Sequence, residues 1–188
     1  MNNRELKGIY NKLYKHFGPQ HWWPADTRLE VAIGAVLTQN TSWSNVERAI
    51  VNLKKKKLVS LKKLSNINTK NLAKEIKPAG YFNVKARRLK NLMVFFTKRC
   101  GGNLFSIRKI KTVNLRRELL GVNGIGPETA DSILLYAFDK PIFVVDAYTK
   151  RIFSRLRIIP KDSGYNDMQR LFMKSLTRSA KLFNEKSS

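Results

Sequence analysis

The sequence predicts an all-α protein, and three features of the chain support that class. Apolar residues recur at helical spacing in nearly every segment. Residues that start or end helices separate these segments at short intervals. The longest segment that could form a strand is "PIFVV", at residues 141–145, so a sheet is not expected.

The first half of the chain divides into helices at residues that favour helix ends. Residues 1–18 form an amphipathic helix and lack the pattern of a signal peptide. Thr27 and Glu30 match a capping box that opens the helix "RLEVAIGAVLTQ". Ser44 and Glu47 match a second capping box, which opens "NVERAIVNLKKKK". We therefore expect two successive helices in this region.

Glycine and proline mark the ends of the helices that follow. The segment "NLAKEIKPAGYF" gives a short helix that stops at Pro78 and Gly80, and "NVKARRLKNLMVFFTKRC" gives a long one that ends at paired glycines. Helical spacing in "LRRELLGV" leads to "NGIG", where Gly126 is the expected N-cap and Pro127 the first residue of another helix. A helix after Asp146 and a last helical run, "NDMQRLFMKSLTRSAKLF", complete the prediction.

The chain is strongly basic, which indicates a polyanionic partner. Its 37 Lys and Arg residues outnumber 13 Asp and Glu residues, and the formal net charge of +24 is spread along the sequence. No apolar run approaches the roughly 18 to 20 residues that span a bilayer, so no membrane partner is expected. Nucleic acid in the cytoplasm is the expected partner. The single cysteine, Cys100, rules out an internal disulfide or an all-cysteine metal cluster within this chain.

Residues 119–152 combine a glycine hairpin with an isolated aspartate, and both suit a DNA substrate. Gly124 and Gly126 lack a Cβ, so their backbone can lie against a ligand. The N–H groups of the helix that follows carry the positive end of the helix dipole, which favours a phosphate. The alternative is an ordinary turn between two core helices. Asp146 follows an apolar run, and its alternative role is that of a helix N-cap.

Taken together, these residues resemble the helix-hairpin-helix DNA glycosylase superfamily, in its endonuclease III-like branch. The family pattern is a hairpin of the "GIG" type, a "TA" pair and an apolar segment that ends in "VD". This sequence carries the pattern as Gly124, Ile125 and Gly126, Thr129 and Ala130, and Val145 and Asp146. The resemblance runs from about residue 21 to residue 155, and it implies two α-helical lobes with a DNA-binding cleft between them.

The resemblance also implies how the chain divides between the lobes. Residues 21–140 form a six-helix, barrel-like lobe that includes the helix-hairpin-helix. Residues 1–20 and 141–188 form a discontinuous second helical lobe, which carries the catalytic aspartate.

Two further motifs imply how such a protein opens the duplex. "GAVLTQNTS" resembles the helix end that carries the family's duplex-probing glutamine, here Gln39, and "GYFNVKA" places Tyr81 at the position of the second wedging residue. A glycosylase must rotate the target nucleotide out of the stack, and these side chains fill the gap. Asp146 then stabilises the oxocarbenium-like sugar, orients or activates a water, or does both.

The resemblance departs from the bifunctional members of the family at one position. Those members have a nucleophilic lysine between the hairpin and "TA", where this chain has Glu128. A carboxylate cannot form a Schiff base with the sugar, so AP-lyase activity is not expected. Lys85 and Lys150 are the alternative amines, and neither occupies the family position.

A group of aromatic residues is similar to the base pocket of the 3-methyladenine DNA glycosylase III group. The matching residues are Trp22, Trp23, Pro24 and Trp43. Stacking a cationic alkylpurine on electron-rich rings adds about 1 to 2 kcal/mol of cation–π attraction. The alternative is that individual tryptophans belong to the core.

We therefore expect a monofunctional, bacterial or archaeal glycosylase that removes alkylated purines from double-stranded DNA in base excision repair. It is expected to act as a monomer, without a metal, an iron–sulfur cluster or another cofactor. One alternative is a glycosylase for a deaminated or oxidised base. Another is a non-catalytic DNA-binding protein, because the chain stops at "KLFNEKSS", short of the longer last helix that the resemblance implies.

Overall fold

The computed structural model describes residues 3–18, 23, 25–176 and 178–186 of the 188-residue chain. The α-helices are α1 (Asn3–Phe17), α2 (Arg28–Leu37), α3 (Trp43–Lys55), α4 (Leu61–Asn66), α5 (Thr69–Glu75), α6 (Phe82–Cys100), α7 (Thr112–Leu120), α8 (Pro127–Ser132), α9 (Ala147–Arg155), α10 (Tyr165–Ser175) and α11 (Ala180–Lys186). The shorter helical elements are η1 (Lys77–Ala79), η2 (Leu104–Lys109) and the π-helical η3 (Ile133–Ala137). No strand occurs among these residues, so the all-α class is confirmed.

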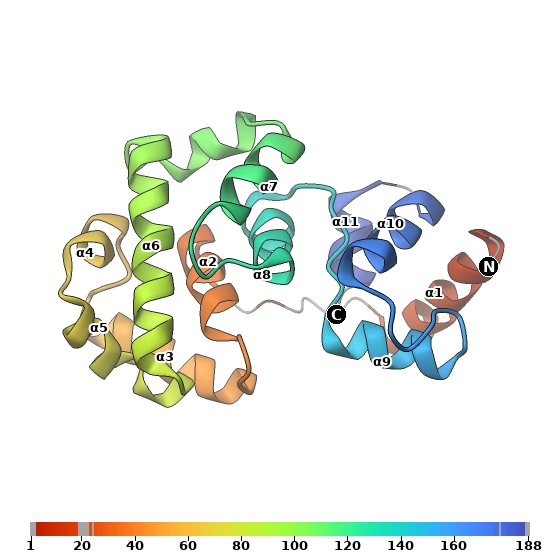
Figure 1. The fold of residues 1–188 in the computed structure, drawn as a ribbon, viewed down its shortest axis with the longest axis horizontal. Coiled ribbons are helices and arrows are strands. Elements are labelled where there is room, and N and C mark those ends of the chain that lie inside the picture. The colour runs from red at the N-terminus through yellow and green to blue at the C-terminus, as the bar shows by residue number, and fades with distance from the viewer. Residues whose placement is uncertain (1–2, 19–22, 24, 177, 187–188) are drawn as a thin grey trace.

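The helices form two lobes, as Figure 1 shows. One lobe contains α2 to α8, with the long helix α6 crossing its full height. The other contains α9, α10 and α11, and α1 lies at its outer edge, so both ends of the chain belong to this lobe. An extended segment, residues 139–146, joins η3 to α9 and connects the lobes. The residue boundaries expected for the two lobes remain a prediction.

The first lobe is built around α2. Every residue of α2 from Leu29 to Leu37 is buried, and the helix packs against α3, α6, α8 and η3. After Arg28 at its start, its sequence is apolar on all sides except at Glu30, which suits a helix that is enclosed by others. The Glu30 carboxylate pairs with the Lys54 ammonium of α3 at 2.8 Å. Because Gln39 follows this buried helix by two residues, the core fixes the position from which Gln39 projects.

The Thr27 cap of the first predicted capping box is confirmed, and the second box is wrong. Thr27 Oγ1 accepts a hydrogen bond from the Glu30 N–H at 3.2 Å, as predicted. The reciprocal bond of the first box is shifted by one residue, because Glu30 Oε2 accepts from the Asp26 N–H at 3.3 Å. The helix α3 begins at Trp43, and its N-cap is Ser42, whose side chain makes no capping bond. Ser44 therefore lies inside the first turn rather than at the cap. The earlier start places Trp43 on the helix, where it packs against Trp23.

The structure corrects two further expectations about the helices. Residues 58–70, which the sequence left unassigned, contain α4 and the first turn of α5. The last predicted helix is two helices, α10 and α11, because the backbone is extended at Leu176. Gly126 and Pro127 do occupy the predicted N-cap and first turn of α8. Within the described residues, no helix is long and apolar enough to cross a membrane.

Candidate functional site

The glycine hairpin lies between α7 and α8, and its shape depends on Gly124. Gly124 has φ +93°, a conformation that favours glycine, and a Cβ at this position would overlap the Arg88 side chain of α6. Ile125 is buried and anchors the hairpin in the core. Gly126 is exposed, with open space where a Cβ would stand. The hairpin thus packs against Arg88 and is anchored in the core by Ile125, while Gly126 at the start of α8 is exposed.

Gln39 connects α2 to this hairpin. Its Nε2 donates to Thr129 Oγ1 at 2.9 Å and to the Gly124 carbonyl at 3.3 Å, and its Oε1 accepts a hydrogen bond from Arg88. These residues, with Glu128 and Tyr165, line an open pocket of about 530 Å³. The structure therefore brings together the predicted glutamine, the hairpin and Thr129. Ala130, the other half of the "TA" pair, is fully buried beneath them.

Tyr81 is the most exposed of the predicted site residues for which the structure gives a value. It has 72% of its surface exposed, and its φ of 44° and ψ of 31° place it in the left-handed region. A bulky side chain in this conformation costs on the order of 1 kcal/mol. It stands at the N-cap position of α6, directly after Gly80. A largely exposed aromatic ring is available to enter a stack of bases.

Asp146 stands at the N-cap of α9, at the end of the extended segment between the lobes. Its Oδ1 accepts a hydrogen bond from the Thr149 N–H at 2.7 Å, so the capping role considered from the sequence is real. The carboxylate is also near enough to Glu128, in the first turn of α8, for its charge to act on that side chain. Although part of Glu128 is exposed, desolvation of its carboxylate raises its pKa, and the negative charge of Asp146 raises the pKa further.

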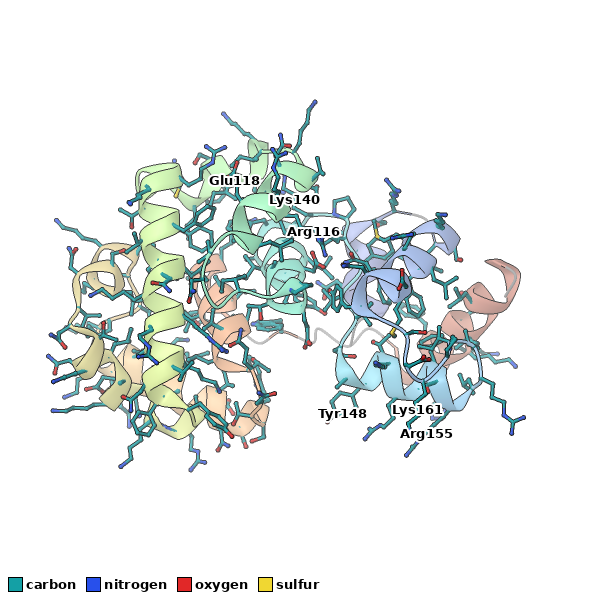
Figure 2. The ribbon with its side chains drawn as sticks, in the orientation of Figure 1. Arg116, Glu118, Lys140, Tyr148, Arg155 and Lys161 are labelled. Atoms are coloured by element: carbon teal, nitrogen blue, oxygen red, sulfur yellow. The ribbon has the colours of Figure 1, made fainter. Side chains whose placement is uncertain are left out.

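A buried polar network holds the segment that delivers Asp146. At its centre, Asp131 is fully buried and accepts two hydrogen bonds from Arg116, at 2.7 and 3.0 Å. Tyr165 Oη and Gln169 Nε2, both on α10, donate to Asp131 Oδ2 at 2.8 and 2.7 Å. Gln169 Nε2 also donates to the Phe143 carbonyl at 2.7 Å. Arg116 lies at the border of the two lobes (Figure 2), so the network joins them.

The hydrogen bonds of this network favour one fixed arrangement of Arg116, Asp131, Tyr165 and Gln169. Burial and the Asp131 carboxylate raise the pKa of Tyr165, while the backbone amide of Val145 acts in the opposite direction. Tyr165 therefore stays protonated and remains a donor to Asp131. A buried carboxylate with this many donors is costly to disturb, because any lost partner leaves a buried group unsatisfied.

Of the predicted aromatic pocket, the structure describes Trp23 and Trp43. Their rings meet edge to face with centroids 5.3 Å apart, and Trp23 stacks on Tyr136 of η3 at 4.9 Å. Trp23 also lies against Gly34 of α2, where a Cβ would stand 3.0 Å from the indole ring. One face of Trp23 is therefore covered by protein. Trp22 and Pro24, the other two predicted pocket residues, lie outside the described residues.

The two alternative amines occupy very different surroundings. Lys85 is 1% exposed, and its Nζ donates to the carbonyls of Leu37 and Ala79 at 2.8 and 2.7 Å. Burial, with a smaller contribution from Arg88, lowers the pKa of Lys85 to about 8. Lys150, in contrast, is exposed on α9. Lys85 is thus a structural lysine that ties α2 to η1.

Sequence reasoning missed several residues of this site. The missed residues come from separate helices and belong to none of the quoted family motifs. They are Arg88, Asp131, Tyr136 and Tyr165. Only Asp131 had a signal in the sequence, because it is an acidic residue directly after "TA" inside an apolar helix. The other three are brought to the site by tertiary packing.

Comparisons with known proteins agree with this geometry. The family model "HhH-GPD superfamily base excision DNA repair protein" matches residues 33–178. A Methanocaldococcus jannaschii protein named "Putative DNA repair glycosylase MJ1434" is 49% identical over 178 residues, which cover 94% of this chain and 81% of that protein. Endonuclease III of Thermotoga maritima is 30% identical, over 80% of this chain and 66% of its own length.

The fold is also shared with solved structures. The crystal structure of Helicobacter pylori 3-methyladenine DNA glycosylase (MagIII) bound to 1,N6-ethenoadenine has a TM-score of 0.83 and 29% sequence identity. It matches 100% of this chain and 94% of the MagIII chain. The two-lobed helical fold is thus shared with a solved DNA glycosylase. The chain belongs to the HhH-GPD superfamily of base excision DNA repair proteins.

Proposed function

We propose that this DNA glycosylase is monofunctional and hydrolyses the bond between an alkylated purine and its deoxyribose in duplex DNA. The observation that carries the proposal is the position of Asp146, at the end of the segment between the lobes and near enough to the hairpin helix for its charge to act on Glu128. A phosphate bound by the hairpin would bring a sugar close to that carboxylate. The exposed amides and helix dipole at the start of α8 suit such a phosphate.

Opening of the duplex is assigned to Tyr81 and Gln39. Tyr81 is exposed and can enter the stack where the damaged nucleotide leaves it. Gln39 is hydrogen-bonded to Gly124 and Thr129 in the free protein, so it would exchange these bonds for contacts with bases when DNA binds. The hairpin and the probing glutamine would then respond to DNA together.

The chemical step requires one carboxylate. The N-glycosidic bond breaks with its electron pair on the departing base, and positive charge develops at C1′ of the sugar. Asp146 stabilises this charge and accepts a proton as water adds to C1′. An alkylated purine that carries a positive charge leaves as a neutral base, so no general acid is needed. A neutral lesion would leave as an anion and would require one.

The absence of AP-lyase activity is part of the proposal. The family position of the nucleophilic lysine is occupied by Glu128, which cannot form a Schiff base. Lys85 is buried, and its ammonium is occupied by two carbonyls. We also propose that the protein acts as a monomer without an iron–sulfur cluster, because its single cysteine cannot provide the usual four ligands.

The preference for alkylated purines is supported by the aromatic residues and by one relative. Trp43 and Trp23 stand together at the start of α3, and an electron-rich ring attracts a cationic base. The MagIII structure, 29% identical to this chain, contains 1,N6-ethenoadenine. Since Tyr136 covers one face of Trp23, we assign the stacking role to Trp43 and a supporting role to Trp23.

The test is release of free base from duplexes that each carry one lesion. The panel contains 3-methyladenine, 1,N6-ethenoadenine, hypoxanthine and 8-oxoguanine, and the released base is identified by mass spectrometry. We expect 3-methyladenine to be released fastest. Release of hypoxanthine or 8-oxoguanine alone would replace the alkylated substrate with a deaminated or oxidised one. DNA binding without release of any base would contradict the enzymatic proposal.

A further inference from the structure

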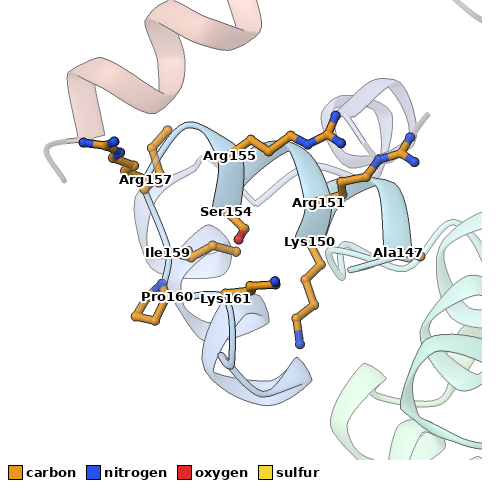
Figure 3. A pocket seen from close by; sticks show the side chains of 10 residues that line it. Ala147, Lys150, Arg151, Ser154, Arg155, Arg157, Ile159, Pro160 and Lys161 are labelled. Carbon is orange, nitrogen blue, oxygen red and sulfur yellow. The ribbon is translucent and has the colours of Figure 1, made fainter.

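The second lobe contains a basic pocket that the proposed reaction does not use. It has a volume of about 940 Å³ and lies between α9 and the loop that follows it, residues 156–161. Figure 3 shows its lining. The cations that line it are Lys150, Arg151, Arg155, Arg157 and Lys161, and no acidic residue lines it.

Among the side chains that the structure describes, none neutralises these cations. No described carboxylate lies within 4.0 Å of any of their charged groups. The Arg151 guanidinium lies over the Tyr148 ring, 4.9 Å from its centroid, which leaves the guanidinium edge available to an anion. Cations gathered in this way repel one another, and a bound polyanion relieves that repulsion.

Three polar groups of the pocket are placed to bind one anion. In Figure 3 the Lys161 side chain extends toward Lys150, and the Ser154 hydroxyl is directed into the same space. Two ammonium groups and a hydroxyl are typical donors to a phosphate. Ile159 and Pro160 form the apolar wall beside them, so the anion would be held at one side of the pocket.

The pocket lies on the same helix that Asp146 caps. Its first lining residue, Ala147, follows Asp146 directly, and α9 extends from there for nine residues, or about 13 Å. Duplex DNA carries a phosphate about every 3.4 Å of its axis on each strand, so a helix of this length spans several phosphates. Figure 2 shows Tyr148, Arg155 and Lys161 along one edge of the second lobe.

We propose that α9 and residues 156–161 form a second phosphate-binding site for duplex DNA, separate from the glycine hairpin. Lys150, Ser154 and Lys161 bind one backbone phosphate, and Arg151 and Arg155 attract its neighbours. The DNA is then held on both sides of Asp146, by the hairpin on one lobe and by α9 on the other. This inference deepens the proposed function, since it rests on DNA as the partner.

The test measures binding of undamaged duplex, by fluorescence anisotropy over a range of salt concentrations. We expect the double variant Lys150→Gln/Lys161→Gln to bind about tenfold more weakly at moderate salt. The slope of log affinity against log salt should be smaller in magnitude by about 1 to 2, because each phosphate contact contributes about 0.9. Circular dichroism and thermal unfolding of the variant verify that it is folded.

A charge-matched control separates a local site from loss of net charge. The variant Lys62→Gln/Lys70→Gln removes two exposed lysines from α4 and α5, on the side of the first lobe away from α9 (Figure 1). We expect its salt slope to stay close to that of the parent. An equal decrease in both double variants would overturn the proposal, because net charge alone would then explain the effect.

A scan with neutral methylphosphonates locates the contact on the DNA. The duplex for this scan carries one abasic-site analogue, which fixes the register of the protein on the DNA. In the parent, substitution should weaken binding at two separate places, and the Lys150→Gln/Lys161→Gln variant should lose sensitivity at one of them. Loss of sensitivity at neither place would overturn the proposal. Calorimetric titration with inorganic phosphate tests a free anion as the ligand. Saturable phosphate binding that the variant abolishes, with an unchanged salt slope for DNA, would also overturn it.

The test of the second phosphate-binding site does not depend on catalysis. These measurements use undamaged duplex or a duplex with an abasic-site analogue, so they hold whether or not the parent releases a base. Failure of the lesion panel would contradict the proposed function, and failure of the salt and methylphosphonate experiments would contradict the second phosphate site.

Discussion

Gln169 donates a 2.7 Å hydrogen bond from Nε2 to Oδ2 of Asp131 and thereby joins α10 to α8. The same nitrogen lies 2.7 Å from the Phe143 carbonyl, in the segment that ends at Asp146. Through Gln169, the buried Asp131 carboxylate thus helps to hold the segment that ends at Asp146, which is 15 positions further along the chain. Any change at Asp131 should affect both the stability of the protein and the geometry at Asp146.

Replacing Asp131 with Asn should destabilise the protein strongly. The variant keeps the shape of the side chain but leaves the Arg116 guanidinium without its charged partner. The free energy of unfolding should fall by about 2 to 4 kcal/mol, measured by urea denaturation. Asp162→Asn, at an exposed position, is the control and should unfold like the parent. Equal stability of the two variants would show that the network contributes little.

Replacing Asp146 with Asn separates catalysis from helix capping. Asparagine caps helices as well as aspartate does, so the fold and α9 should be retained. The rate of base release should fall by a factor on the order of 10² to 10⁴, because the charge that stabilises the sugar is lost. DNA affinity should stay similar or increase, since a negative charge near phosphate is removed. Parental activity in the Asp146→Asn variant would leave Asp146 as a helix cap alone.

Replacing Glu128 with Lys should introduce AP-lyase activity. The new amine would stand at the family position of the nucleophile, within the electrostatic influence of the Asp146 carboxylate. We expect borohydride to trap a covalent complex between this variant and an abasic duplex, and to trap none with the parent. Glu128→Gln, which removes the charge without adding an amine, is the control. Trapping of the parent would contradict the monofunctional proposal and would direct attention to Lys150.

Substitutions at Trp43 test stacking on a cationic base. Trp43→Leu retains much of the apolar area but removes the ring, so release of 3-methyladenine should fall about tenfold, the loss expected for 1 to 2 kcal/mol. Trp43→Phe keeps an aromatic face and should lose less. Affinity for an abasic duplex should be the same in both variants, because neither the hairpin nor Tyr81 is changed. Equal rates for the leucine and phenylalanine variants would assign Trp43 to packing.

Lys85 should make stability depend on pH above neutrality. Its pKa is about 8 in the folded protein and 10.5 ordinarily, so between these values the unfolded chain binds more protons. Stability should therefore rise with pH from about 8 to 10.5 through this residue, by up to about 3 kcal/mol. The comparison is urea denaturation of the parent and of Lys85→Met at pH 7.5 to 10. A constant difference between the two proteins over this range would contradict the assignment.

The sequence by itself determined the fold class and the local features of the candidate site. Gly124 and Gly126, with Pro127 after them, define a turn and a helix start through their own backbone preferences, which do not depend on distant residues. The cap at Thr27 follows from a hydrogen bond over three residues. Asp146 was found because an apolar run isolates it. Such features are local, so the order of residues specifies them.

The tertiary structure decided which side chains act on these features. Serine is a residue type that favours helix N-caps, which is why the sequence predicts a cap at Ser44. The helix α3 nevertheless begins earlier, where Trp43 can pack on Trp23. Packing also determines that Tyr136 covers one face of Trp23.

Long-range contacts likewise lie beyond local patterns. Arg88 and Gln39 are 49 positions apart, and Gln39 and Thr129 are 90 apart. A periodic pattern describes neighbours within a few turns, whereas these contacts depend on how whole helices pack. The basic pocket of α9 is of the same kind, because the loop after the helix folds back and brings Lys161 to Lys150. Sequence spacing locates residues on a helix, but only the packing of helices determines which residues meet.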